Sequence, residues 1–196
     1  MRVIAGTLRG RRLSAPPGDA TRPITDRVKE TLFNILGSRW GEPGELPPVS
    51  VLDVFAGTGG LGIEALSRGA QRCTFIERDR AAIRCLRENL AALDLLGRAA
   101  VSTVNAWSMR PPPGDPGFGL VFVDPPYRDT RSAPRVVDLL ERLATALAPD
   151  GVIVFRHEVA SLASVPPEML AALEVVDERT IGPMRLTLLQ RRAIAR

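Results

Sequence analysis

Apolar and polar positions alternate in regular blocks from residue 51 towards the end of the chain. Short apolar runs predict buried strands at 51–55, 73–77, 100–104, 119–124 and 152–155. Stretches with helical spacing of apolar residues lie between them and predict helices at 60–70, 78–93 and 133–147. Repeated strand–helix units indicate a doubly wound α/β sheet, in which ligands bind at the carboxyl ends of the strands.

The last part of the chain has a different pattern. Residues 173–191 contain two runs of apolar and β-prone residues on either side of Gly182-Pro183. This arrangement predicts two antiparallel strands joined by a tight turn. We therefore expect a mixed sheet whose last strand runs antiparallel to its neighbours.

The first 40 residues are patterned separately from the repeated units. Residues 2–5 and 11–14 are short β-prone runs around a turn and predict a hairpin. Thr25 is placed to cap a helix that begins at Asp26 and has apolar residues at helical spacing. A connector rich in proline and glycine follows at 41–50. The sequence therefore predicts an N-terminal extension at 1–40 and a main domain at 50–192.

Several classes of protein are disfavoured by composition. No apolar run is long enough to span a bilayer, and the N-terminus lacks a signal sequence, so we expect a cytoplasmic protein. Cys73 and Cys85 are the only cysteines and lack the spacing of metal ligands, which predicts buried free thiols and no metal site. A monomer is the default expectation.

Positive charge is concentrated at the N-terminus. Residues 1–40 carry eight basic and three acidic side chains, a net charge of +5, whereas the whole chain carries +4. Basic side chains gathered on one surface favour nucleic acid, because binding releases counterions from the phosphates. A solvated surface explains the same charge equally well.

A glycine motif follows the first apolar run of the main domain. Gly57, Gly59 and Gly62 stand in the pattern G-x-G-x-x-G, at the start of a predicted helix. Glycines let the backbone turn sharply and approach a ligand, and the helix N-terminus offers free N–H groups. The pattern fits both dinucleotide-binding proteins and enzymes that use S-adenosylmethionine.

Two carboxylates favour S-adenosylmethionine. Asp53 lies four residues before Gly57, where it would repel a pyrophosphate but could hold the amino end of a methionine group. Glu77 ends the next predicted strand and could accept hydrogen bonds from both ribose hydroxyls. The alternatives are that Asp53 partners a helix dipole and that Glu77 is a solvated strand end. Further expected cofactor contacts are Phe55, Asn105 and Ala106.

The most specific motif is Asp124-Pro125-Pro126-Tyr127, at the end of the run 119–124. Two prolines make a rigid turn whose carbonyls point outward. The Asp124 carboxylate and the Pro125 carbonyl could accept both N–H bonds of an exocyclic amine, while Tyr127 stacks on the base. The motif predicts methyl transfer to such an amine. His157, Trp40 and Trp107 are expected to be packing or surface residues, and Glu158 could line the pocket mouth.

The motifs together resemble a known family. MRVIAGTLRGRRL, TRPITDRVKETLFNIL, VLDVFAGTGGLGIEALSRGA, FIERD and VFVDPPY, in this order, are similar to the RsmD-type bacterial 16S rRNA guanine-N2 methyltransferases. The resemblance implies a class I S-adenosylmethionine-dependent methyltransferase fold, a Rossmann-like sheet of seven strands, with an N-terminal hairpin and helix. It also implies that the substrate is a guanine in the small ribosomal subunit or its assembly intermediate.

The same resemblance assigns roles to residues. Gly57, Gly59 and Glu77 would bind cofactor, and residues 124–127 would hold the base. Contacts with RNA are implied for Arg9, Arg11, Arg12, Arg22 and Arg27, with Thr25 near the entrance of the site. A DNA adenine-N6 methyltransferase and a non-catalytic RNA-binding assembly factor remain alternative interpretations.

Overall fold

The computed structural model describes residues 1–16, 24–113, 116–162 and 165–193. They form two compact units, Met1–Ala106 and Trp107–Arg196. The seven strands make the mixed sheet of the class I methyltransferase fold, with the order β3-β2-β1 in the first unit and β4-β5-β7-β6 in the second. The predicted division into an N-terminal extension at 1–40 and a main domain at 50–192 stays a prediction.

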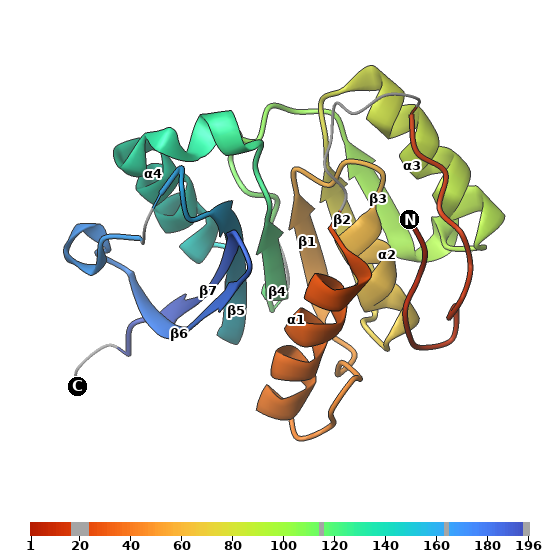
Figure 1. The fold of residues 1–196 in the computed structure, drawn as a ribbon, viewed down its shortest axis with the longest axis horizontal. Helices are drawn as coiled ribbons and strands as arrows, with labels where there is room; N and C mark the ends of the chain where they lie inside the picture. The colour runs from red at the N-terminus through yellow and green to blue at the C-terminus, as the bar shows by residue number, and fades with distance from the viewer. Residues whose placement is uncertain (17–23, 114–115, 163–164, 194–196) are drawn as a thin grey trace. The chain divides into compact units, whose positions relative to one another are not determined.

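The first unit contains three parallel strands and three helices (Figure 1). The strands are β1 (Ser50–Val54), β2 (Arg72–Ile76) and β3 (Ala99–Ser102). The helices are α1 (Asp26–Arg39), α2 (Gly60–Ser67) and α3 (Arg80–Ala92), and a short 3-10 turn, η1, spans Leu96–Arg98. Val54 pairs with Ile76, so β1 and β2 end together.

The predicted N-terminal hairpin is an antiparallel chain reversal with one β-bridge, Arg2 to Arg12. Three backbone hydrogen bonds hold it: Val3 N to Arg11 O and Gly10 N to Val3 O, both at 2.9 Å, and Leu13 N to Met1 O at 3.0 Å. Thr25 caps α1 as predicted, since its side chain accepts a hydrogen bond from Val28 N.

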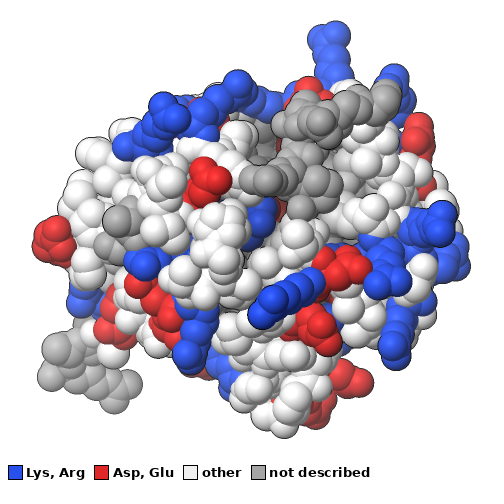
Figure 2. Space-filling model, viewed as in Figure 1, with Lys and Arg blue, Asp and Glu red and all other residues white. Residues whose placement is uncertain are grey.

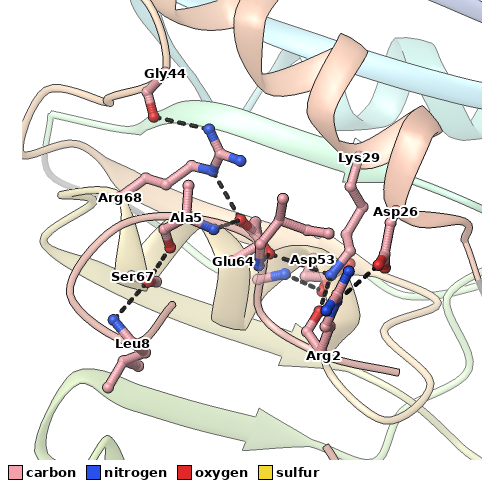
Figure 3. Close-up of polar contacts among 12 residues, drawn as sticks. Arg2, Ala5, Leu8, Asp26, Lys29, Gly44, Asp53, Glu64, Ser67 and Arg68 are labelled. Atoms are coloured by element: carbon pink, nitrogen blue, oxygen red, sulfur yellow. Dashed lines mark hydrogen bonds and ion pairs between the residues drawn. The ribbon is translucent and has the colours of Figure 1, made fainter. Parts of the chain in front are cut away.

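A buried carboxylate joins this N-terminal segment to α1 and α2 (Figure 3). Glu64 on α2 is fully buried and accepts hydrogen bonds from the amides of Ile4 and Ala5 at 2.8 and 3.0 Å. It also forms ion pairs with Lys29 at 3.2 Å and Arg68 at 2.8 Å. Four donors compensate for the desolvation of this carboxylate, which would otherwise be costly.

A buried amide fixes the same segment to α3. The Asn89 side chain accepts a hydrogen bond from Ser14 N at 2.7 Å and donates to Ser14 O at 3.0 Å. It also donates to the carbonyl of Thr58, in the glycine loop, at 3.0 Å. One side chain therefore supports both the N-terminal segment and the loop before α2.

The second unit contains four strands and one long helix. The strands are β4 (Phe118–Val123), β5 (Leu147–Glu158), β6 (Leu173–Ile181) and β7 (Met184–Arg191). Helix α4 spans Ala133–Ala144, and two short 3-10 helices, η2 and η3, span Tyr127–Arg131 and Pro167–Met169. β4 and β5 are parallel, whereas β7 is antiparallel to both β5 and β6. The prediction of an antiparallel last strand is confirmed.

We expect Glu64→Ala to lower the free energy of unfolding by about 3–5 kcal/mol, because Lys29 and Arg68 would keep buried charges without their partner. Urea denaturation measures this change. Arg2→Ala is the control, since it removes only the exposed pair with Asp26 and should cost about 1 kcal/mol or less. Equal effects of the two substitutions would contradict the role given to Glu64.

Candidate functional site

The glycine loop has the backbone that its sequence predicts. Gly57 and Gly59 have positive φ values of 55° and 90°, and Gly59 caps α2. Gly62 has a packing role, because a Cβ there would stand 2.3 Å from Phe75 Cε1 on β2. The three glycines therefore serve a turn, a helix start and close packing of a helix on a strand.

Asp53 lies near the end of β1 and is buried, with 1% of its surface exposed. Its Oδ2 accepts a hydrogen bond from Gly62 N, in the first turn of α2, at 2.8 Å. This contact matches the alternative interpretation that Asp53 partners a helix dipole. It places the carboxylate at the positive end of α2. Its contact with a cofactor stays a prediction.

Glu77 follows β2 and is fixed by the backbone of two loops. Its Oε2 accepts a hydrogen bond from Gly57 N at 2.8 Å. Its Oε1 accepts from the amides of Arg78 and Asp79 at 2.7 and 2.8 Å. A carboxylate has about four acceptor positions, so Glu77 retains capacity for hydroxyl donors. The structure thus brings Gly57 and Glu77 together.

The other expected cofactor residues also follow strands of the first unit. Phe55 comes directly after β1 and has a φ of 65°, an unusual backbone conformation for an aromatic residue. Asn105 is exposed and Ala106 is buried, both shortly after β3. All of them lie at the carboxyl ends of parallel strands, where ligands of this fold class bind.

The Asp124–Tyr127 motif in the second unit begins directly after β4. Pro125 is buried, whereas Asp124 and Tyr127 are partly exposed. The residues that follow hold the turn in place. Pro126 O accepts a hydrogen bond from Asp129 N, and Tyr127 O accepts one from Thr130 Oγ1, both at 2.8 Å. Within the described residues, no hydrogen bond to the Pro125 carbonyl occurs, so this acceptor remains available.

Arg156 on β5 is a residue of this site that our sequence reasoning missed. Its Nε donates to Asp124 Oδ1 at 2.8 Å, and its Nη2 approaches the Tyr127 hydroxyl at 3.5 Å. Burial raises the pKa of Asp124, and the adjacent guanidinium opposes that rise. The predicted apolar strand at 152–155 ends before Arg156 and gave no signal for this contact, which depends on the pairing of β4 with β5.

Of the remaining residues singled out by sequence, His157 and Trp107 pack in the interior. His157 is fully buried and stacks on Phe155 with a centroid distance of 4.6 Å, and burial lowers its pKa. Trp107 is buried beneath the Arg135 guanidinium, which lies 4.2 Å from the ring centroid. Trp40 and Glu158 are partly exposed. Cys73 and Cys85 are buried free thiols, as predicted.

The arginines expected to contact RNA are exposed where the structure describes them. Arg9, Arg12 and Arg27 have no described side-chain partner, and Arg11 donates to the carbonyl of Ala92 at the end of α3 at 2.9 Å. Arg22 lies outside the described residues. Contact of these arginines with RNA stays a prediction.

A groove of about 640 Å³ lies in the first unit beside α3. Its lining residues are Arg78, Arg80, Ile83, Arg84, Arg87, Glu88 and Thr103. Figure 2 shows Lys and Arg side chains projecting at the margin of the molecule where α3 lies. In the described part of the chain, none of the four arginines forms an ion pair, so the groove is strongly basic.

The described residues contain no group of three or more histidine, cysteine or acidic side chains placed to hold a metal ion. No helix in the described ranges has both the length and the apolar character needed to cross a membrane.

Known proteins match this chain over nearly its whole length. The family model "Conserved hypothetical protein 95" matches residues 1–190. Ribosomal RNA small subunit methyltransferase D of Escherichia coli K12 is 41% identical over 194 residues, which cover 98% of this chain and 91% of that protein. The same enzyme of Haemophilus influenzae is 42% identical over 130 residues, 65% of this chain and 64% of its own.

Solved structures agree with the sequence match. The Escherichia coli protein yhhF has a TM-score of 0.76 and 37% identity, with 99% of each chain covered. A ribosomal protein L11 methylase from Lactobacillus delbrueckii subsp. bulgaricus, at 18% identity and a TM-score of 0.64, shares the fold over 89% of this chain and 92% of its own. The family match and the identity over nearly the whole chain together show that this protein belongs to the RsmD-type family of rRNA methyltransferases.

Proposed function

We propose that this protein transfers a methyl group from S-adenosylmethionine to the exocyclic N2 amine of a guanine in 16S rRNA. The observation that carries the proposal is the Asp124–Tyr127 turn, which combines a carboxylate, an available carbonyl and an aromatic ring after β4. The substrate follows from the small-subunit enzymes among its relatives. The guanine N2 position rests on the family resemblance.

The residues of the first unit fit the cofactor. Among the described residues, no atom other than those of Gly57 and its two chain neighbours lies within 4 Å of where a Cβ on Gly57 would stand, which favours a ligand at this point. Gly57 and Gly59 would hold it against the start of α2, and Glu77 would accept hydrogen bonds from the ribose hydroxyls. When bound, the cofactor supplies a methyl group on a positively charged sulfur.

The residues of the second unit would prepare the amine. Asp124 and the Pro125 carbonyl each accept one N–H bond, which turns the nitrogen lone pair out of conjugation with the ring. Tyr127 stacks on the base and fixes its plane. Much of the rate acceleration comes from this orientation, and no strong general base is needed because the alkylated amine readily loses a proton.

The RNA-facing surface would include the groove beside α3 as well as Arg9, Arg11 and Arg12. Arg80, Arg84 and Arg87 recur at spacings of four and three on one side of the helix. Like charges at this spacing repel one another by a few tenths of a kcal/mol, and phosphates relieve that repulsion. Arg11 is anchored at the end of the same helix, so both basic segments belong to one unit.

The target is tested with labelled S-adenosylmethionine. The protein is incubated separately with small ribosomal subunits lacking the modification, free 16S rRNA, DNA and protein extract. We expect label in N2-methylguanine from the subunits or the rRNA. Recovery of N6-methyladenine from DNA would overturn the proposal. Cofactor binding without transfer to any substrate would instead favour the assembly-factor interpretation.

Asp124→Ala should lower kcat by about 10²–10³-fold, because a preorganised hydrogen-bond acceptor at the reacting group is lost. The dissociation constant for the cofactor, measured by calorimetry, should stay the same. Asp138→Ala is the matched control in the same unit, since its carboxylate is exposed and, among the described residues, pairs with Arg142 alone. Normal turnover by the Asp124 variant would refute its catalytic role.

Replacing Arg80, Arg84 and Arg87 together by Gln should weaken rRNA binding and flatten its salt dependence. Each lost phosphate contact reduces the slope of log K against log salt by about 0.7–0.9, so the slope should fall by about 2–3. A control removes the same charge elsewhere, at Arg39, Arg179 and Arg192. An unchanged slope in the first variant, or an equal change in the control, would exclude the groove as the binding surface.

A further inference from the structure

Asp124 and Arg156 are brought together by strand register. Val123 on β4 pairs with Phe155 on β5 in a parallel ladder, so the next residue along each chain is a cross-strand neighbour of the other. The resulting ion pair is short, at 2.8 Å between Arg156 Nε and Asp124 Oδ1. Backbone pairing thus holds the two residues as neighbours, and the ion pair joins their side chains.

The pair lies where water screens it poorly. Arg156 is 5% exposed, and 20% of the Asp124 side chain is accessible. Charged hydrogen bonds are strong in such surroundings, and an unpaired charge there is costly. Arg156 therefore compensates for the desolvation of Asp124. The ion pair uses Oδ1, and Oδ2 of the partly exposed side chain stays outside this contact.

The same guanidinium reaches the aromatic residue of the motif. Its Nη2 lies 3.5 Å from the Tyr127 hydroxyl. A planar guanidinium holds its nitrogens in a fixed relation. One side chain thus relates the orientation of the carboxylate to that of the ring.

We propose that Arg156 is a positioning residue, which keeps Asp124 ionised, directs its Oδ2 to the amine and aligns Tyr127 for stacking. The proposal rests on the function proposed above for residues 124–127. Among the described residues of this unit, Arg156 on β5 is the charged side chain that contacts Asp124. The Tyr127 hydroxyl, on η2, lies near the same guanidinium.

The expected pH dependence follows from the charges. Burial raises the pKa of Asp124 and Arg156 opposes the rise, so removal of the guanidinium should raise it further. The ionised carboxylate is the stronger acceptor of an amine N–H bond, so kcat should fall as the pH drops through that pKa. The acid limb of the kcat profile should therefore move to higher pH in Arg156→Gln.

The experiment compares Arg156→Gln and Arg156→Lys with the wild type. In Arg156→Gln we expect an upward shift of the acid limb by about 1–3 pH units and a fall in kcat larger than any change in KM. Arg156→Lys should restore part of the acid-limb position and part of kcat, because it restores the positive charge but not the planar guanidinium. Arg185→Gln is the control, since it breaks another arginine–carboxylate pair of the same unit, with Glu178.

A second measurement separates this proposal from the proposed function. Titration of the Asp124 carboxyl carbon by NMR requires no turnover, and it should show a higher pKa in Arg156→Gln than in the wild type. An unchanged titration curve, or an acid limb identical to that of the wild type, would overturn the role of Arg156. The absence of methyl transfer by the wild type, together with the expected titration shift, would refute the function alone.

Discussion

Parallel pairing of strands is the constraint from which both candidate sites arise. Residues that follow a paired position in two parallel strands are themselves neighbours, and each unit builds part of its site in this way. Val54 pairs with Ile76, so Phe55 and Glu77 leave β1 and β2 side by side. In the second unit the corresponding pairing places Asp124 beside Arg156. Residues that are 22 and 32 positions apart are thereby juxtaposed without any local sequence signal.

Buried carboxylates impose a second constraint, and the protein meets it in three ways. Asp53 is stabilised by an amide in the first turn of α2. Glu64 accepts hydrogen bonds from two backbone amides and forms ion pairs with two cations, so all of its described contacts stabilise the fold. Asp124 has one described cation and retains partial exposure. Asp124 is the one of these three carboxylates that is partly exposed, which is why the incomplete compensation of its charge is functionally informative.

The sequence predicted those features that depend on local pattern. Strand and helix positions follow from periodicity, and Thr25 caps α1 because its hydroxyl needs only the next turn. Ends were less accurate, since β5 begins at Leu147 rather than at residue 152. Contacts set by register were not predictable. Arg156 follows the predicted strand 152–155 and has no motif around it. The burial of Glu64 is explained only by the positions of Lys29 and Arg68 beside it.

Arginine is abundant in this chain, so its surroundings must decide what each one does. Arg156 and Arg68 are almost fully buried and bound to carboxylates, and their charge is neutralised locally. Arg80, Arg84 and Arg87 are exposed along one groove and lack ion pairs with any described residue. A neutralised arginine can orient a group but cannot attract a distant anion, whereas an unneutralised cluster attracts phosphate strongly and orients little. The roles proposed for these arginines, positioning and RNA binding, therefore differ with burial and not with residue type.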